Sequence, residues 1–359
     1  MNNYCIFNQT TVNNFNTQMA TPPITIKDIA KTLGISASTV SRALKDHPDI
    51  SPRTKQLVQN FAKKVHYRPN ALALNLRRSK TNTIGIILPE LVHHFFSSVL
   101  AGIDKVAYAA GYNVMICQSN EEYEREVINA QALIDNRVDG ILISLSKTTY
   151  DLDHIQSIID QGIPVVFFDR APESIETDKV LIDDFTGAKI ATHHLMAIGC
   201  KKILHLAGPQ NLLIGQKRLE GYRDALKENG IAFDPNLVIK CDTQDEVYAN
   251  AGKILQIANQ IDGIFTVNDS TAIAAMQILM KNGYEVPDQI SVIGFGDGPN
   301  ATIVYPALST VEQKGSEMGK EAVQLLMKQM EDEGEVHIPQ TKVLTPVLRI
   351  RESTTKMRD

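Results

Sequence analysis

The apolar positions between residues 25 and 65 predict three short helices. One helical face is marked by Ile26, Ile29, Ala30 and Leu33. Gly34 then tolerates the positive φ of a tight turn, and the side-chain oxygen of Ser36 can cap a second helix. A third helix is predicted to begin with Ser51 as its cap and Pro52 in its first turn, and its inward positions are Leu57, Val58, Phe61, Ala62 and Val65. We expect this segment to fold as a small all-α unit.

The second predicted helix has a polar outer face. Ile35, Val40 and Leu44 bury its inner side, so the outward positions are Ala37, Ser38, Ser41 and Arg42. A short helix with hydroxyls and one arginine fits the major groove of DNA, where Arg bridges O6 and N7 of guanine. The alternative is a helical packing module whose polar face only meets water.

Beyond residue 80, strand-like apolar runs alternate with amphipathic helical patterns. The predicted strands are residues 84–88, 113–117, 140–144, 164–169, 202–207, 263–268 and 291–294. The predicted helices are residues 96–110, 123–136, 186–198, 219–229 and 270–282. Alternation of this kind predicts parallel sheets with crossover helices.

An internal echo predicts that this part of the chain forms two lobes. Val138-Asp139-Gly140 in the first half matches Ile261-Asp262-Gly263 in the second, and each leads from a helix end into a strand. Open parallel sheets bind ligands beyond the carboxyl ends of their strands. We therefore expect a ligand cleft between the two lobes.

Charge is distributed unequally along the chain. Residues 21–80 contain twelve Lys and Arg against three Asp and Glu, a net charge of +9, and the first twenty residues carry no charged side chain. The whole chain has a net charge of −5, so residues 81–359 hold 24 basic and 38 acidic side chains, a net charge of −14. A basic segment neutralises DNA phosphates, whereas an acidic one avoids nucleic acid. The distribution favours DNA binding by the first segment.

The order of these segments resembles that of one bacterial family. After the three helices come Tyr67-Arg68-Pro69-Asn70, a short apolar segment at residues 71–78, and the strand-like Thr83-Ile84-Gly85-Ile86-Ile87-Leu88-Pro89. Over residues 24–351 this order resembles the LacI/GalR family of bacterial transcription regulators. The resemblance implies a small all-α helix-turn-helix domain joined by a hinge helix to a two-lobed α/β core with parallel sheets, similar to type I periplasmic binding proteins.

The expected domain boundaries follow from the pattern and the resemblance together. Residues 1–23 are expected to be a disordered extension, 24–68 the helix-turn-helix domain, 69–82 the hinge, 83–352 the core and 353–359 a tail. Within the core, the first lobe is expected at residues 83–181 and 312–334, and the second at 183–308 and 340–352. The chain would cross between lobes near residues 181–183, 308–312 and 334–340.

The resemblance also implies which residues contact DNA. In the family the hinge helices of two subunits pair in the minor groove and a leucine opens a central base step, a place that Leu76 occupies here, followed by Arg77. The alternative for Leu76 is a cover over the junction between the domains. The expected DNA-binding set is Thr25, Ser36, Ala37, Ser38, Thr39, Ser41, Arg42, Asn70, Ala73, Leu76 and Arg77. The implied partners are a pseudo-palindromic double-stranded operator and a second copy of the chain.

Matching strand ends to the family pattern gives a candidate effector site. The expected contacts are Phe95, Phe96, Asp169, Arg170, Arg218, Asn268, Asp269 and Asp297. An aromatic ring suits the C–H face of a sugar or a flat base, and a charged strand end favours a polar cleft. For each residue the alternative is structural, because aromatics fill cores and Asp or Asn caps helices.

Two departures from the family pattern restrict the expected ligand. Position 296 is glycine where the family usually has an aspartate, so either Asp297 takes that role or the ligand lacks the hydroxyls that a carboxylate would bind. Leu212 and Ile214 are apolar where purine-responsive relatives carry polar contacts, which disfavours a purine. A carbohydrate or sugar derivative is the expected effector.

Other signals are sparse. The four cysteines lack metal or disulfide spacing and fit a reducing cytoplasm; they are Cys5, Cys117, Cys200 and Cys241. Residues 1–23 have neither the basic nor the apolar region of a signal peptide, and no apolar run is long enough to span a bilayer. We therefore expect a cytoplasmic, nucleoid-associated protein that uses no cofactor or metal.

The sequence leaves three functional classes open, and one is favoured. The favoured interpretation is an allosteric transcription regulator, expected to be a repressor. A sugar-binding transport component has the same two-lobed core, but the basic segment and the lack of an export signal argue against it. An enzyme would need a phosphate loop, a nucleophile elbow or a metal triad, and none is evident in the sequence.

Overall fold

The computed structural model describes residues 24–65, 67, 80–331 and 337–355. The chain forms two compact units, residues 1–79 and residues 80–359, which we call the head and the core. Residues 1–23 and 68–79, which hold the predicted disordered extension and most of the predicted hinge helix, lie outside the described residues.

The described part of the head, residues 24–65 and 67, contains three helices: α1 (Ile26–Leu33), α2 (Ala37–Leu44) and α3 (Pro52–Lys64). Gly34 ends α1 with a φ of 65°, the left-handed conformation that glycine adopts without strain. Ser36 and Ser51 cap α2 and α3, because their side chains accept hydrogen bonds from the backbone N–H groups of Thr39 and Thr54. The helix-turn-helix prediction and both of its serine caps are confirmed.

The predicted inner face of α3 was wrong at one position. Leu57 has an exposed fraction of 51%, whereas Val58 and Ala62 are buried against α1 and α2. On a helix, consecutive residues are separated by about 100°. The inward stripe is centred on Val58 and Ala62, so Leu57 falls at its edge and remains in solvent.

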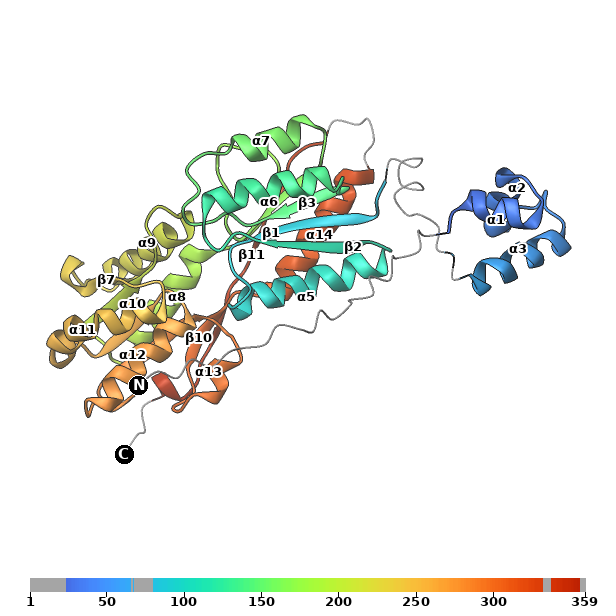
Figure 1. Ribbon diagram of the computed structural model, residues 1–359. Coiled ribbons are helices and arrows are strands. Elements are labelled where there is room, and N and C mark those ends of the chain that lie inside the picture. The colour runs from blue at the N-terminus through green and yellow to red at the C-terminus, as the bar shows by residue number, and fades with distance from the viewer. Residues whose placement is uncertain (1–23, 66, 68–79, 332–336, 356–359) are drawn as a thin grey trace, which may run out of the picture. The chain divides into compact units, whose positions relative to one another are not determined.

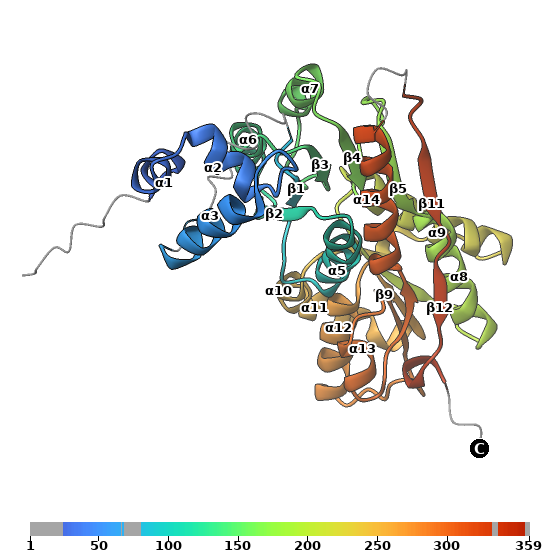
Figure 2. The ribbon, with the colours of Figure 1, turned by 90° about the vertical axis from the view of Figure 1, so that its right-hand side faces the viewer.

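Two six-stranded sheets form the core (Figures 1 and 2). The first has the order β11-β5-β4-β3-β1-β2 with all neighbours parallel. Its strands are β1 (Thr83–Leu88), β2 (Asn113–Gln118), β3 (Gly140–Ile143), β4 (Val165–Phe168), β5 (Asp178–Ile182) and β11 (Thr341–Leu344). The second has the order β12-β10-β9-β8-β6-β7 and is parallel except for the β10–β12 pair. Its strands are β6 (Ile203–Ala207), β7 (Val238–Lys240), β8 (Gly263–Thr266), β9 (Ser291–Gly296), β10 (Ser309–Glu312) and β12 (Val347–Arg349).

Helices cover both faces of the first sheet, and together they make the first lobe. One face carries α5 (His94–Ala109) and α14 (Gly315–Glu331), and the other carries α6 (Tyr123–Asp135) and α7 (Asp153–Asp160). Alternate strand residues serve the two faces: Val166 and Phe168 pack toward α5 and α14, and Val165 and Phe167 toward α6 and α7. Strands buried on both sides explain why they appear in the sequence as continuous apolar runs.

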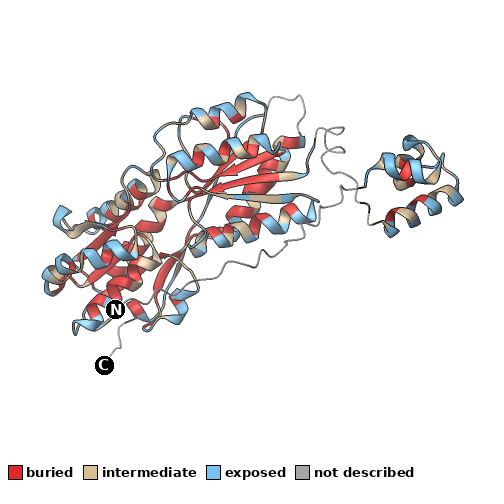
Figure 3. Cartoon of the chain, in the orientation of Figure 1, coloured by how far each residue is buried: buried red, intermediate tan, exposed pale blue. Residues whose placement is uncertain are grey.

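The second lobe repeats this arrangement. One face of its sheet carries α10 (Gln244–Ala249), α11 (Ala251–Ile257) and α12 (Asp269–Lys281), and the other carries α8 (Asp184–Ala197) and α9 (Leu213–Glu228). Short elements complete the core: η1 (Pro235–Leu237), η2 (Ala258–Gln260), α13 (Asn300–Ile303) and η3 (Glu352–Thr354). Figure 3 shows buried residues concentrated on the strands and on the sheet-facing sides of the helices. The predicted two-lobed α/β core is confirmed.

The third crossing between lobes was placed wrongly. The chain changes sheets between β5 and α8, between β10 and α14, and between β11 and β12. Because β11 pairs with β5, residues 341–344 belong to the first lobe, and the last crossing lies at residues 345–346 instead of 334–340. All of β10, residues 309–312, lies in the second sheet, so the second crossing follows at residues 313–314, before α14 begins. Both β11 and β12 are short and half exposed, so their apolar pattern carries little signal.

The predicted tail also begins too early. Ser353 and Thr354 are fully buried, and both side chains are hydrogen-bonded to Ser309. The core therefore extends at least through the 3-10 helix η3.

Candidate functional site

A cavity of about 590 Å³ opens where strands of both lobes end. Its wall is made by the loop after β3, the turn after β4, the end of β5 with the start of α8, and the start of α9, and Val343 of β11 adds one side chain. Both lobes contribute, as expected for a site at the carboxyl ends of parallel strands. The two predicted effector residues in the wall are Asp169 and Arg170.

Asp169 follows β4 in a left-handed backbone conformation, with a φ of 60°. Its exposed fraction is 6%, and its Oδ1 atom has no hydrogen-bond partner in the structure. Burial raises the pKa of this carboxyl group to about 6, although the neighbouring Arg170 opposes the shift. Because Oδ1 is itself buried, a ligand donor would reach it only when the surrounding wall moves.

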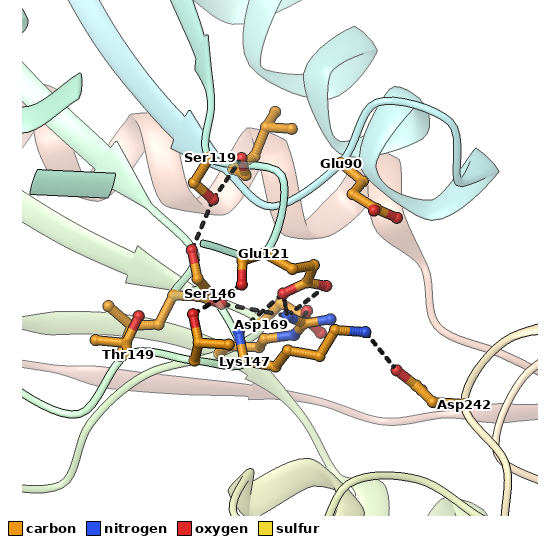
Figure 4. Close-up of polar contacts among 12 residues, drawn as sticks. Glu90, Ser119, Glu121, Ser146, Lys147, Thr149, Asp169 and Asp242 are labelled. Carbon is orange, nitrogen blue, oxygen red and sulfur yellow. Dashed lines mark hydrogen bonds and ion pairs between the residues drawn. The ribbon is translucent and has the colours of Figure 1, made fainter. Parts of the chain in front are cut away.

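Arg170 is held in an internal ion pair. Its Nη1 atom donates to both carboxylate oxygens of Glu121, over 2.9 Å and 2.7 Å, while the backbone N–H of Lys147 donates to the same carboxylate over 2.8 Å. The guanidinium carbon lies 5.9 Å from the centre of the Phe96 ring. Figure 4 shows Glu121, Lys147 and Asp169 gathered at this end of the first lobe. The Nε atom of Arg170 is buried without a hydrogen-bond partner.

Polar contacts across the cleft join the lobes. Lys147, which follows β3 in the first lobe, places its Nζ atom 3.1 Å from Oδ2 of Asp242, which follows β7 in the second lobe (Figure 4). The side-chain amide of Asn211 donates to the backbone carbonyl of Lys147 over 2.6 Å. Within the second lobe, the side-chain amide of Asn268 donates to the backbone carbonyl of Asp242 over 2.8 Å. The contacts of Lys147 with Asp242 and Asn211 are the ones that join the lobes.

The remaining charged candidates are engaged with other protein groups. Arg218 is buried, donates from Nε to Asp184 over 2.8 Å, and has its guanidinium 3.7 Å from the centre of the Phe295 ring. Asp269 accepts from the backbone N–H of Gly298 over 2.9 Å and from the hydroxyl of Thr310. Burial raises the pKa values of the Asp184 and Asp269 carboxyl groups. Arg218 and Asp269 support the strand ends and lie outside the cavity wall, whereas Asp184 lines it.

The other candidates also have structural partners. Asn268 caps α12 by accepting from the backbone N–H of Thr271, and Phe96 is buried in the first-lobe core with the half-buried Phe95 at its edge. Asp297 binds Arg351 over 2.6 Å. Each of these positions thus has a structural partner, and Asp297 is not among the residues that line this cavity; their contact with an effector stays a prediction.

Sequence reasoning missed a buried carboxylate that shapes the wall. Glu126 of α6 is fully buried and accepts from the backbone N–H and hydroxyl of Ser146 over 2.6 Å and 2.9 Å, from Thr149 over 2.8 Å, and pairs with His154 at 3.1 Å. It fixes the loop after β3, which carries Ser146 and the exposed ring of Tyr150 into the cavity wall. The signal was available, because Glu126 shares the apolar face of its helix with buried residues four and seven positions later.

The head presents the predicted outer face. Ala37, Ser38 and Arg42 are exposed on α2, and Ser41 and Thr39 are half-buried. Thr25 and Ser36 act as the N-terminal caps of α1 and α2. The predicted hinge contacts lie outside the described residues: Asn70, Ala73, Leu76 and Arg77.

Comparison with known proteins identifies the class of this chain. The family model for bacterial regulatory proteins of the lacI family matches residues 25–70, and the model for periplasmic binding proteins and the sugar-binding domain of the LacI family matches residues 81–347. The chain therefore belongs to the LacI family of bacterial regulatory proteins. It is a DNA-binding transcription regulator.

Curated relatives cover almost the whole chain. The HTH-type transcriptional repressor PurR of Vibrio atlanticus is 32% identical over 314 residues, which cover 86% of this chain and 92% of that protein. The ribose operon repressor of Halalkalibacterium halodurans is 32% identical over 309 residues, covering 86% and 90%. The HTH-type transcriptional regulator DegA of Bacillus subtilis is 31% identical over 335 residues, covering 93% and 98%.

Solved structures agree with the fold. The transcriptional regulator CelR in complex with cellobiose is 29% identical, with a TM-score of 0.69 over 92% of this chain and 99% of that one. The lac repressor dimer bound to operator and an anti-inducer has a TM-score of 0.81 at 23% identity, over 93% and 100% of the two chains. Among the described residues, no helix has the length and apolar character needed to cross a membrane.

Proposed function

We propose that the chain is a transcriptional repressor that binds a pseudo-palindromic operator as a homodimer. A saccharide that binds between the core lobes raises or lowers its affinity for the operator. The observation that carries the effector half of this proposal is the unsatisfied Oδ1 atom of Asp169 in the cavity wall. Relatives support the ligand class, since one is a ribose operon repressor and a similar structure holds cellobiose. The lac repressor structure supports the dimer on an operator.

In the head, we assign base reading to the exposed face of α2. Arg42 is its cationic side chain and can bridge a guanine, while Ser38 and Ser41 can contact base edges or phosphates. Thr25 and Ser36 lie at helix N-termini, where backbone N–H groups bind phosphate oxygens. From the family resemblance, Leu76 of the hinge opens the central base step, with Asn70, Ala73 and Arg77 beside it.

In the core, we assign effector binding to Asp169 and Arg170. The Oδ1 acceptor of Asp169 and the Nε donor of Arg170 have no hydrogen-bond partner and lie on adjacent residues of the wall, with Nε 3.9 Å from the other carboxylate oxygen of Asp169. A sugar hydroxyl satisfies both, because it donates one hydrogen bond and accepts others. Tyr150, which is 78% exposed, adds an aromatic surface for the C–H face of the sugar.

The cross-lobe contacts suggest how binding is transmitted. Lys147 and Asn211 bridge the lobes from the two sides of the cleft. A ligand that changes the separation of the lobes must strengthen or break these contacts. The first strand of the first lobe, β1, directly follows the hinge segment in the sequence. A rotation of the lobes driven by ligand binding therefore changes how the two hinge segments of a dimer pair on DNA. This couples the effector cavity to the DNA-binding surface.

No catalytic step forms part of the proposal. The wall hydroxyls of Ser146 and Thr149 both donate to Glu126, whose carboxylate also contacts His154. Among the described residues, no imidazole is hydrogen-bonded to either hydroxyl to take its proton. We place the protein in the bacterial cytoplasm, where operator DNA and free saccharide meet.

The proposal is tested by fluorescence anisotropy of the full chain on palindromic duplexes from its own upstream region, with and without a saccharide panel. We expect tight, sequence-dependent binding that one saccharide shifts. Arg42→Ala should lose preference at one base pair of each half-site, about 1–3 kcal/mol, while Leu76→Ala should weaken specific binding far more than non-specific binding. Unchanged base preference in the first variant, or equal losses in the second, would contradict the assigned roles.

A further inference from the structure

We propose that the effector is an uncharged saccharide, and that the cavity rejects phosphorylated or carboxylated sugars because carboxylates behind its wall already neutralise its cations. This inference rests on the proposed function, since it concerns the ligand of the same cavity.

The wall of the cavity is acidic. It contains four carboxylates, Asp169, Glu173, Asp183 and Asp184, against two cations, Arg170 and Lys217, a formal charge of −2. When the ion-pair partners Arg218, Glu121 and Glu220 behind the wall are counted too, six carboxylates lie beside three cations. An anionic ligand therefore enters a site of its own sign. Repulsion between like charges grows as water is excluded from a cleft.

Each of the two cations has an internal partner. Arg170 donates to both oxygens of Glu121, a carboxylate that is 9% exposed. Lys217 lies 2.7 Å from Glu220 on the same helix. At the mouth of the cleft Lys147 is paired in the same way with Asp242. A phosphate could recruit a cation only by separating one of these pairs.

Separating the Arg170 pair is expensive because Glu121 is buried. Removing its partner would leave a carboxylate in a low-dielectric environment, and that cost exceeds what a surface ion pair costs to break. The Lys217 pair is half exposed, with side-chain exposed fractions of 43% and 48%, so solvent screens it and it offers little net attraction. Neither cation is therefore available to bind an anion.

The unpartnered atoms select a hydroxyl. Asp169 Oδ1 is an acceptor and Arg170 Nε is a donor, and both are buried. A neutral hydroxyl satisfies both, whereas a phosphate or carboxylate oxygen can only accept and would oppose the Asp169 carboxylate. Leu145, Leu213 and Pro172 supply apolar surface for the remainder of the sugar.

The test is isothermal titration of the full chain at physiological ionic strength with matched pairs: ribose and ribose 5-phosphate, glucose and glucose 6-phosphate, and glucose and glucuronate, with cellobiose and a purine base added. We expect the neutral member of the binding pair to bind at least tenfold more tightly than its anionic partner. An anionic member that binds as well or better would overturn the inference while leaving saccharide control intact.

Two variants test the stated cause. Glu121→Gln frees Arg170 and keeps an acceptor for the backbone of Lys147, so it should raise the relative affinity for the phosphate ester at least tenfold. Glu220→Gln frees Lys217 on the exposed face of α9 without changing a buried residue. It should raise the relative affinity for the phosphate ester about threefold. Asp224→Asn is the control, because it removes one negative charge from the same helix at a site that pairs with Lys189.

The outcomes separate the two levels of the proposal. The inference would be overturned if the affinity ratio of neutral to anionic sugar were the same in Glu220→Gln, Glu121→Gln and Asp224→Asn. Internal pairing would then not be what excludes anions. The protein could instead bind operator DNA while no sugar in the panel, neutral or anionic, binds the protein or changes its operator affinity. Saccharide control would then be wrong, and the inference that rests on it would be wrong too.

Discussion

Replacing Asp169 with Asn should stabilise the core at neutral pH, at the expense of effector binding. The folded-state pKa of Asp169 is raised from 3.8 to about 6 by burial. A carboxyl group with a raised folded-state pKa binds a proton more readily in the folded protein than in the unfolded chain. Its ionisation therefore costs stability as the pH rises from about 4 through 6. The difference of 2.2 pH units corresponds to about 3 kcal/mol at 1.36 kcal/mol per unit.

The measurement is urea unfolding of the full chain, followed by circular dichroism between pH 4.5 and pH 8. Asp169→Asn and the wild type should differ least at pH 4.5, and the variant should become more stable by up to about 3 kcal/mol by pH 7, where the difference levels off. Asp224→Asn, which removes an exposed carboxylate, should show no such gain. A variant that is less stable than the wild type at pH 8, or a difference that does not change with pH, would refute the reasoning.

Two further predictions concern packing and capping. Gly319→Ala should destabilise the core by about 1–3 kcal/mol, because the added Cβ would lie 2.1 Å from the carbonyl oxygen of Val99 across the α5–α14 contact. Gly252→Ala on α11 is the matched control, because its Cβ meets nothing within 4 Å. It should stabilise the core by about 0.5–1 kcal/mol in the same unfolding assay. Equal effects at the two glycines would contradict the close approach of the helices. Ser36→Ala should cost the head about 1 kcal/mol and weaken operator binding, while Ser36→Gly should cost only a few tenths; thermal melting of the two variants decides this.

Local sequence signals were enough to predict most of the fold. The caps at Ser36 and Ser51, the turn at Gly34 and the apolar runs of the central strands depend on neighbours a few residues away, and each is confirmed. The edge strands were not predictable in this way. β11 is recognisable as part of the first lobe only through its pairing with β5, about 160 residues earlier in the chain.

The site was less predictable, for a related reason. The sequence placed Asp169 and Arg170 at a polar cleft because this charged pair directly follows a buried strand. The residues that neutralise or brace the wall lie far away in sequence: Glu121 is 49 residues from Arg170, and Asp242 is 95 residues from Lys147. Resemblance to a family assigned Arg218 and Asp297 to the ligand, but their ion pairs depend on partners that a sequence pattern does not reveal.

The central claim is that one molecule couples an effector cleft to a DNA-reading head. It is tested most directly by measuring operator affinity with and without saturating saccharide, and saccharide affinity with and without operator. The account predicts that both affinities change by the same factor, and that this factor differs clearly from one. A saccharide that binds the core tightly but leaves operator affinity unchanged would contradict the account.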